Sequence, residues 1–385
     1  MPLLMCASHA LAQPYTQITA GENHTCALLD SGGVHCWGDN FRQQLGNWSA
    51  TIGNQSAAPV PVPNLNAVAQ IAAGREHNCA ALRDGTVRCW GYNFRGQLGD
   101  GTTATNATPV TVTGISNAVA VTGGGDHSCA LISGGTIKCW GYNGDGELGS
   151  GSTAFTSLIP LDVVGISDAT AISAGMLHTC ALLATNRVRC WGYNNFGALG
   201  DGTFTSRNTP VEISTFVSSS IEAGWNHTCS TYVGAVYCWG ANNFGMLGDT
   251  TTTARNTPVQ VQGVNAATGI NSAARIATGN ESSCAVMSNG GLRCWGMNEY
   301  GQGDHGHGGV YQTTAQYVAA PGCALDIDGD SVAQLTTDGA LLTRALKGLG
   351  GTAVSNGTTG PGIRTTWALM RSHLERNCGV VGLAP

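Results

Sequence analysis

The stretch that decides the fold runs from residue 74 to residue 99 and reads GREHNCAALRDGTVRCWGYNFRGQLG. Its opening Gly-x-x-His-x-Cys and its central Cys-Trp-Gly recur along the chain, with serine replacing the histidine in the last copy. Successive copies begin 49 to 55 residues apart, at Gly21, Gly74, Gly124, Gly175, Gly224 and Gly279. This period predicts a repeat protein in which each copy is one supersecondary unit stacked on the next.

Each copy predicts four short strands. The first strand ends at the starting glycine, Gly74, and has Ile71 three residues before it. The second and third strands cover residues 77–82 and 87–91. A long loop follows, and residues 109–112 alternate as a fourth strand. Four strands in about 50 residues form one propeller blade. The sequence therefore predicts an all-β fold, a β-propeller of six four-stranded blades over residues 13–319.

The loop after Trp90 carries a resemblance to a known family, since it reads Tyr92-Asn93-Phe94-Arg95-Gly96-Gln97-Leu98-Gly99. It is similar to the Trp-Gly-x-Asn-x-x-Gly-Gln-Leu-Gly pattern of the regulator of chromosome condensation repeat. The resemblance covers residues 15–319 and implies a β-propeller. Propellers of this family commonly have seven blades. With six copies here, we expect a six-bladed ring or a seven-bladed type that lacks one blade.

The cysteines fall into pairs, one pair in each repeat. Five pairs are ten residues apart, and the fifth repeat has a pair nine apart across a shorter turn. Two residues of an antiparallel hairpin can stay opposite each other whichever turn length is used. We therefore predict six within-repeat disulfides, and hence an oxidising compartment. The pairs are Cys26 and Cys36, Cys79 and Cys89, Cys129 and Cys139, Cys180 and Cys190, Cys229 and Cys238, and Cys284 and Cys294.

Zinc is the rival use of these cysteines, because five repeats have a histidine two residues before the first cysteine. No Cys-x-x-Cys occurs, and the sixth repeat keeps both cysteines although Ser282 replaces the histidine. We expect each histidine to hydrogen-bond a neighbouring backbone group; they are His24, His77, His127, His178 and His227. We expect the tryptophans after the second cysteines to pack between blades; they are Trp37, Trp90, Trp140, Trp191, Trp239 and Trp295.

The low content of basic residues argues against a nucleic-acid partner. Charged residues make up 10% of the chain, the net charge is −6, and Lys138 and Lys347 are the only lysines. Nucleic-acid binding needs a basic surface that neutralises phosphates, so no nucleic-acid partner is expected. The sequence contains no run of 18 apolar residues, and no transmembrane segment is expected.

Residues 1–12 end in Ala10-Leu11-Ala12, a small-x-small cleavage pattern after a short apolar stretch. We interpret them as the remnant of a signal peptide clipped at its start, because no basic flank precedes the apolar residues. An unstructured tail is one alternative. A lipid anchor at Cys6 is another, although Met5 is a poor residue before a lipidated cysteine.

Residues 320–385 differ in composition and predict a small α-helical calcium-binding module. The segment resembles an EF-hand-like or dockerin-like loop, in which oxygen ligands converge on one hard cation. The resemblance implies calcium as cofactor, held by Asp326, Asp328, Asp330, the Val332 carbonyl, Gln334 and Asp338. The loop departs from the pattern at Ser331, where glycine is expected, and at Thr337, where an acid is expected. A solvated acidic turn is the alternative.

A helix is predicted from residue 363, because Ile363, Trp367, Met370 and Leu374 fall on one stripe. Cys378 continues this stripe and faces the core of the module. We predict that it forms a disulfide with Cys323, which closes the module.

The long loop after each tryptophan contains a position that differs between repeats while the surrounding frame recurs. It lies five residues after the tryptophan and holds Arg42, Arg95, Asp145, Phe196, Phe244 and Tyr300. Variable loops on a rigid frame are typical of recognition surfaces, so we predict that these residues contact a partner. Ordinary loop packing is the alternative.

The predicted function rests on the absence of known catalytic motifs and on the roles of the family that the repeat resembles. No Gly-x-Ser-x-Gly, His-Glu-x-x-His or phosphate loop occurs, and no catalysis is expected. The resemblance implies binding, since the family includes a nuclear exchange factor for a small GTPase and secreted bacterial inhibitors of β-lactamases. The predicted disulfides disfavour GTPase exchange and favour a secreted, periplasmic or cell-surface scaffold that binds or inhibits a protein. An extracellular enzyme acting on polysaccharide or peptide, or a structural part of an envelope assembly, are the alternatives.

Overall fold

The structure, a computed structural model, describes residues 15–47, 54–214, 216–264, 272–299 and 311–318. The predicted signal remnant and the predicted calcium module lie outside these residues. The described strands form six four-stranded antiparallel sheets. Among the described residues, no helix is long and apolar enough to cross a membrane.

The strands follow the repeats, four to each sheet. The first two sheets contain β1 (Tyr15–Ala20), β2 (His24–Leu29), β3 (Val34–Asp39), β4 (Gln55–Pro61), β5 (Val68–Ala73), β6 (His77–Leu82), β7 (Val87–Gly91) and β8 (Asn106–Thr111). The next two contain β9 (Ala118–Gly123), β10 (His127–Ile132), β11 (Ile137–Tyr142), β12 (Thr156–Asp162), β13 (Ala169–Ala174), β14 (His178–Leu183), β15 (Val188–Gly192) and β16 (Arg207–Glu212). The last two contain β17 (Ser220–Ala223), β18 (His227–Tyr232), β19 (Ala235–Gly240), β20 (Arg255–Gln260), β21 (Ala273–Thr278), β22 (Ser282–Met287), β23 (Leu292–Met297) and β24 (Tyr311–Tyr317).

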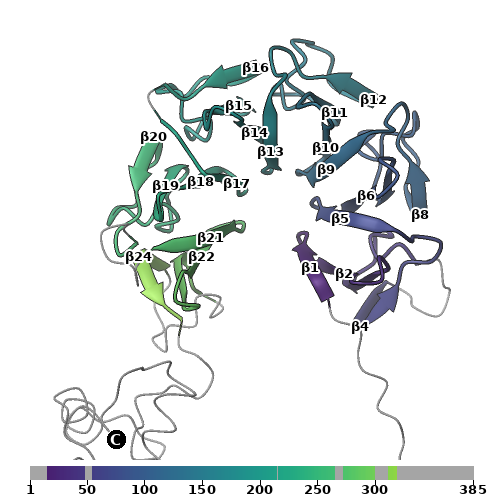
Figure 1. Ribbon diagram of the computed structural model, residues 1–385, viewed down its shortest axis with the longest axis horizontal. Helices are drawn as coiled ribbons and strands as arrows, with labels where there is room; N and C mark the ends of the chain where they lie inside the picture. The colour runs from purple at the N-terminus through teal and green to yellow at the C-terminus, as the bar shows by residue number, and fades with distance from the viewer. Residues whose placement is uncertain (1–14, 48–53, 215, 265–271, 300–310, 319–385) are drawn as a thin grey trace, which may run out of the picture. The chain divides into compact units, whose positions relative to one another are not determined.

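Each sheet is one propeller blade, and the predicted six four-stranded blades are confirmed. Within a blade the four strands pair in sequence order. Figure 1 shows the first strand of every blade at the centre and the fourth at the periphery. The fourth strand pairs irregularly with the third, and in the second blade Pro109 lies in this irregular stretch of β8. An outer edge strand tolerates proline because its missing N–H breaks no inner ladder.

The within-repeat disulfides are present in all six blades. Cys79 lies directly opposite Cys89 in the β6–β7 hairpin, and the two Cα atoms are 4.1 Å apart. Cys229 and Cys238 are likewise opposite at the same Cα separation, although only nine residues separate them. The shorter turn therefore leaves the register of the pair unchanged, as predicted.

The apolar core lies between blades rather than within them. The described residues form five buried clusters, one for each pair of successive blades. Between the first and second blades, for example, Leu45 of one blade packs with Ile71 and Trp90 of the next. Five of the six tryptophans that follow a second cysteine are fully buried, which confirms their predicted role in inter-blade packing; they are Trp90, Trp140, Trp191, Trp239 and Trp295, whereas Trp37 of the first blade is half-buried.

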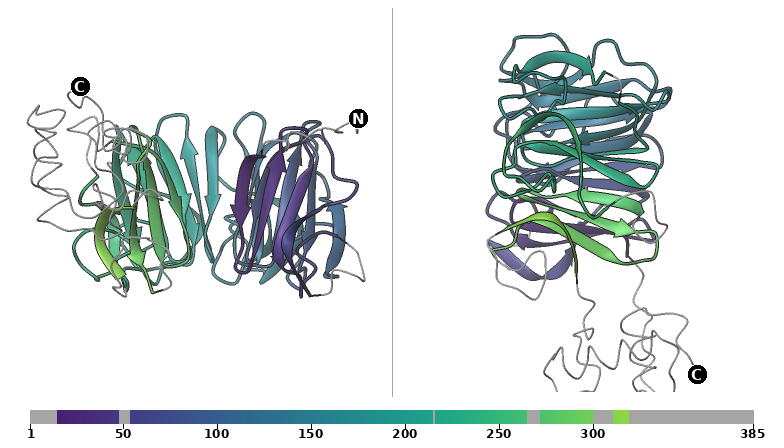
Figure 2. Two further views of the ribbon diagram at one scale, coloured as in Figure 1. Left: turned by 90° about the horizontal axis from the view of Figure 1, so that it is seen from below. Right: turned by 90° about the vertical axis from the view of Figure 1, so that its left-hand side faces the viewer.

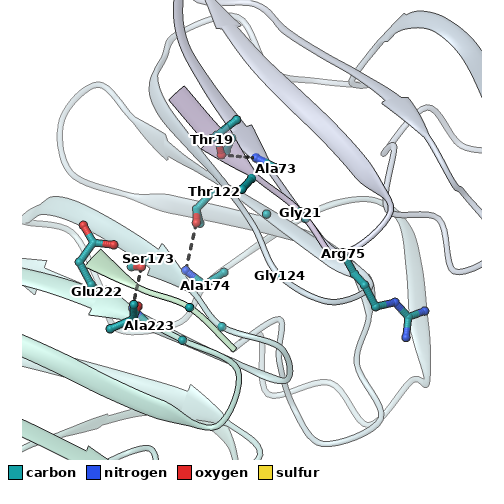
Figure 3. A pocket seen from close by; sticks show the side chains of 18 of the residues that line it. Thr19, Gly21, Ala73, Arg75, Thr122, Gly124, Ser173, Ala174, Glu222 and Ala223 are labelled. Carbon is teal, nitrogen blue, oxygen red and sulfur yellow. Dashed lines mark hydrogen bonds between the residues drawn. The ribbon is translucent and has the colours of Figure 1, made fainter. Parts of the chain in front are cut away.

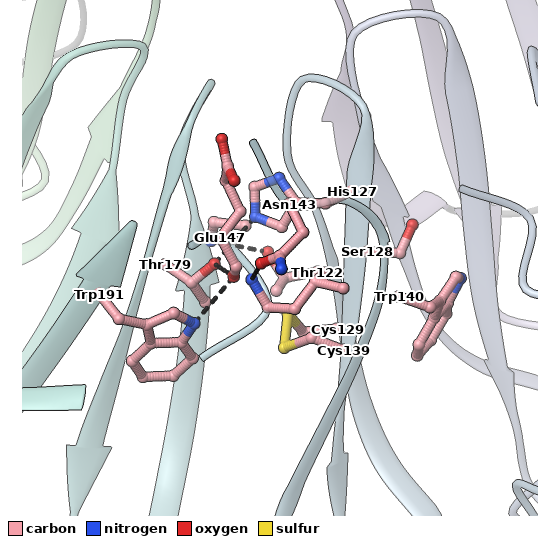
Figure 4. Close-up of a disulfide and its surroundings, with 12 residues drawn as sticks. Thr122, His127, Ser128, Cys129, Cys139, Trp140, Asn143, Glu147, Thr179 and Trp191 are labelled. Carbon is pink, nitrogen blue, oxygen red and sulfur yellow. Dashed lines mark hydrogen bonds between the residues drawn. A yellow bond between two sulfur atoms is a disulfide. The ribbon is translucent and has the colours of Figure 1, made fainter. Parts of the chain in front are cut away.

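The recurrent histidines also join neighbouring blades (Figure 4). His127 Nε2 lies 2.8 Å from Thr179 Oγ1 of the next blade. The Thr179 hydroxyl donates in turn to the Glu147 carbonyl, which also accepts a hydrogen bond from Trp191 Nε1 at 2.8 Å. Because the threonine proton is used for this carbonyl, His127 must donate from Nε2. The expectation of a backbone partner was therefore wrong: the partner is a side chain of the following blade.

Five blades contain such a histidine, and the side chain that it contacts in the next blade is an asparagine, a serine or a threonine. The other four histidine contacts join His24 to Asn78, His77 to Ser128, His178 to Thr228 and His227 to Ser283. Burial lowers the pKa of His77 to about 3 and that of His127 to about 4, so both rings stay neutral at pH 7. The repeat glycine is required here, because a Cβ on Gly74 would lie 2.1 Å from His77 Cε1.

The six blades lie along an arc, and Figure 1 shows an opening between the first blade and the sixth. Ile18 on the first blade is 67% exposed, whereas the equivalent Ile71 is 1% exposed. On the sixth blade Val286 and Leu292 are exposed, although the equivalent residues of every other blade are buried. Among the described residues, the two end blades therefore each present an apolar face without a neighbouring blade.

Candidate interaction face

Two sets of loops meet at one end of every blade. Because the strands alternate in direction, the loops between the first and second strands lie at the same end as those between the third and fourth (Figure 2). We call this end the loop face. Its main segments are residues 40–47, 92–105, 143–155, 193–206 and 241–254.

Buried asparagines hold the long loops of this face in shape. Asn93 donates from its side-chain amide to the carbonyls of Thr102 at 3.1 Å and Ala104 at 3.0 Å. Its Oδ1 accepts a hydrogen bond from the Leu98 amide at 2.9 Å. Asn143, Asn194 and Asn242 repeat these bonds in the next three blades. The loops are therefore ordered platforms on which other side chains can be presented to a partner.

The loop face exposes aromatic side chains to solvent. Phe41 and Phe94 are 65% and 64% exposed, and Phe155 and Phe204 are 56% and 50% exposed. Every exposed phenylalanine of the described residues lies in one of these loops, the fifth being Phe196. Large apolar side chains exposed on the same surface make that surface a candidate interaction site.

Arginines stack on the aromatic rings and cross from blade to blade. The Arg42 guanidinium carbon lies 4.8 Å from the ring centroid of Tyr92 in the next blade. Arg95 lies 5.5 Å from the ring of Tyr142 and 5.4 Å from that of Phe155, again in the next blade. Arginine and aromatic residues dominate binding energy at protein interfaces, because they combine apolar area with directional polar groups.

Ion pairs continue this network toward the centre. Arg42 Nε lies 3.7 Å from Glu76, and Arg75 lies 3.2 Å from Asp126 of the third blade. Burial raises the pKa of Asp126, while Arg75 and Arg95 act in the opposite direction. The first three blades thus share one connected polar and aromatic surface.

The structure places five of the six predicted partner-binding residues on the loop face. Arg42 and Arg95 are half-buried in the stacks just described, and Asp145 is half-buried with its amide donating to Glu147 at 2.9 Å. Phe196 is 36% exposed, and Phe244 is half-buried. These residues have packing roles of their own, and their contact with a partner remains a prediction.

The two aromatic residues of this set pack against other rings. Phe196 lies 6.1 Å from the ring of Tyr193, and Phe244 lies 6.5 Å from that of Tyr311 in the sixth blade. Tyr300, the sixth predicted residue, lies outside the described residues.

Sequence reasoning missed the most exposed side chains. Phe41 and Phe94 stand four residues after the blade tryptophan, one position before those predicted, and Phe155 lies at the far end of its loop. The signal was present, since a phenylalanine in a loop flanked by glycine and asparagine has no apolar pattern to bury it. Arg75, in a loop between first and second strands, was missed because the segment from Gly74 to His77 was used only as the opening motif of the repeat.

The predicted metal and C-terminal disulfide residues cannot be placed on this face. They lie outside the described residues and are Asp326, Asp328, Asp330, Val332, Gln334, Asp338, Cys323 and Cys378. In the part of the chain that the structure describes, no group of three or more His, Cys, Asp or Glu side chains could hold a metal ion. Calcium binding therefore stays a prediction.

Solved structures confirm the fold. Human WBSCR16 superposes with a TM-score of 0.72 at 21% identity, covering 81% of this chain and 83% of that one. Yeast RCC1 (Prp20), solved with Kap60 bound to it, superposes with a TM-score of 0.69 at 23% identity, covering 78% and 74%. At these identities the likeness shows the fold alone.

Sequence comparison shows the family. The Ultraviolet-B receptor UVR8 of Arabidopsis thaliana is 28% identical over 296 residues, which cover 74% of this chain and 54% of the receptor. Protein pim1 of Schizosaccharomyces pombe is 37% identical over 95 residues, which cover 18% of that protein. The chain thus spans about half the length of the receptor and less of pim1. The family model of the RCC1-like domain matches residues 4–331, and the chain belongs to that family.

Proposed function

We propose that this chain is a non-catalytic binding propeller, and that its loop face holds a protein partner. The observation that carries the proposal is the set of exposed phenylalanines beside stacked arginines on one end of the blades. This composition is that of an interface centre, where aromatic and arginine side chains supply most of the affinity. A rigid loop frame lowers the entropic cost of binding, because the loops need not be ordered on association.

The family supports protein binding in general terms. Yeast RCC1 (Prp20) was solved with Kap60 bound, so one protein of this fold holds another protein.

Six disulfides suit an oxidising compartment, and we propose that the chain acts outside the cytosol, in the periplasm, on the cell surface or in the medium. In this proposal residues 320–385 form the calcium-binding module and add a second point of attachment. The chain would then act as an interaction or inhibitor scaffold.

Capture by the full-length chain tests the proposal. The immobilised protein is exposed to extract and to spent medium of its source, and stoichiometric partners are identified by mass spectrometry. Replacing both Phe94 and Phe155 by alanine should weaken capture at least about tenfold, because central aromatic residues each contribute more than about 1 kcal/mol. Val119→Ala is the matched control, since Val119 is 55% exposed but lies near the opposite end of its blade. Equal loss in both variants, or no loss in either, would reject the loop face as the binding surface.

A further inference from the structure

The first strands of the blades line a central channel, a cavity of about 760 Å³ (Figure 3). Hydroxyl side chains two residues before three of the repeat glycines tie neighbouring strands together around it. The Ala73 amide donates to Thr19 Oγ1 at 2.9 Å, and the Ala223 amide donates to Ser173 Oγ at 2.9 Å. A cavity of this size is in the range that proteins use for small ligands.

One blade departs from the pattern of this wall. The equivalent positions hold Thr19, Ala72, Thr122, Ser173, Glu222 and Ala277, so five are small and uncharged and one is a carboxylic acid. Figure 3 shows Glu222 on the channel wall beside Ser173, whose hydroxyl accepts the Ala223 amide. The same hydroxyl hydrogen-bonds the Glu222 carboxyl and favours its ionised form. A glutamate here is not needed for the fold, because threonine, serine and alanine serve the same position in the other blades.

The Glu222 carboxyl has no counter-charge within the part of the chain that the structure describes. It forms no ion pair among the described residues. The other charged residues of the channel wall are Glu22, which is exposed at the rim, and Arg75, which pairs with Asp126. Burial raises the pKa of Glu222 to about 7, the result expected for a carboxyl that lacks a cation.

The rim next to Glu222 is suited to an aliphatic stem. Trp225 and Met176, both half-buried, line the same cavity in the loops that follow the inner strands. An indole ring attracts a cation through its face, and a thioether packs against methylene groups. The channel therefore has an anionic group on its wall and soft apolar groups at its rim.

We propose that the channel is a binding site for one alkylammonium or guanidinium group, which pairs with the Glu222 carboxylate. Ser173 orients that carboxylate, and Trp225 covers the stem of the ligand. The cation can belong to a free amine or to a lysine or arginine side chain of a bound protein. The site does not require the loop-face partner, so failure of one proposal is distinguishable from failure of the other.

Titration of the full-length protein with n-butylammonium tests the site, with n-butanol as the uncharged probe of the same shape. At pH 8 we expect saturable, millimolar binding of the amine, and at least about tenfold weaker binding of the alcohol. Glu222→Gln should weaken amine binding at least about tenfold, whereas Glu22→Gln at the rim should leave it unchanged. Equal binding of the two probes, or equal loss in both variants, would overturn the proposal.

A second readout does not depend on affinity. With ¹³C-labelled glutamate, saturation by n-butylammonium should lower the pKa of the Glu222 carboxyl, because a neighbouring cation favours the ionised form. An unchanged pKa at saturation would place the amine elsewhere. A blocked lysine peptide distinguishes the two sources, since tighter binding than n-butylammonium indicates a protein side chain and weaker binding a free amine.

Discussion

Glu147 is a buried carboxyl in a position that the first and second blades fill with glutamine, Gln44 and Gln97. It is fully buried, its Oε2 accepts the Asp145 amide at 2.9 Å, and its Oε1 has no hydrogen-bond partner. In the second blade the equivalent Gln97 accepts the Arg95 amide through Oε1 and donates to Asp126 through Nε2. Burial raises the pKa of Glu147 from 4.5 to about 7, so folding takes up a proton below that pH.

Glu147→Gln should therefore stabilise the protein in a pH-dependent way. A carboxyl whose pKa is higher in the folded state stabilises folding below about pH 4.5, and this contribution is lost as the pH rises through about 7. At about 1.4 kcal/mol for each tenfold change in proton affinity, the loss amounts to about 3 kcal/mol. The free energy of unfolding of the variant, relative to the natural chain, should rise by up to that amount between pH 5 and pH 8.

Chemical unfolding at the two pH values, followed by tryptophan fluorescence with the disulfides intact, measures this difference. Asp30→Asn is the control, because it removes an exposed carboxyl of the first blade. A Glu147→Gln effect that is the same at pH 5 and pH 8 would refute the assignment of a neutral, buried carboxyl at pH 5.

Three further predictions follow from the packing of the blades. Ile71→Ala should lower the free energy of unfolding by about 2–5 kcal/mol, whereas Ile18→Ala should lower it by under about 1 kcal/mol because Ile18 faces the opening. Equal losses for the two variants in denaturant titrations would mean that the opening is filled. Replacing Cys79 and Cys89 together by serine should cost about 2–3 kcal/mol in the same titration, and an unchanged midpoint would contradict a stapling role. His77→Gln should shift the midpoint of acid unfolding to lower pH. The buried ring has a pKa of about 3, so the stabilisation by neutral His77 is lost as the pH falls from about 6.5 toward 3, and glutamine does not titrate. A midpoint at the same or a higher pH would argue against a neutral His77.

Much of the fold could be predicted because the same strand and cysteine pattern occurs six times in the sequence. The Cys229–Cys238 pair, one residue closer than the rest, indicated opposed positions in a hairpin rather than a metal knuckle, and the structure has that register. The partner of His77 could not be foreseen in this way. Ser128 is 51 residues away, in the next blade, and sequence spacing within one repeat does not show which side chains meet across two.

The opening between the first and sixth blades and the exposed residues of the loop face were also hard to predict, because both depend on contacts between blades. Six copies gave six blades, but whether the last meets the first depends on the angle that side chains such as Trp90 set between neighbours. On the loop face, variability pointed to Arg42 and Arg95, which stack on the next blade. The exposed residue is instead Phe94, one position before Arg95. Only the conformation of the loop shows that Arg95 packs on the next blade while Phe94 faces solvent.

The central claim, that a protein partner binds the loop face, is tested most directly by site-specific photocrosslinking. A benzoylphenylalanine replaces Phe94 in one variant and Asp84 in another, so that the same blade carries the probe at its loop face or in the turn at its opposite end. Both variants are irradiated in native extract or spent medium. If the partner binds the loop face, one discrete crosslinked protein is expected from position 94 and none from position 84. The same product from position 84, or none from position 94, would contradict binding at the loop face.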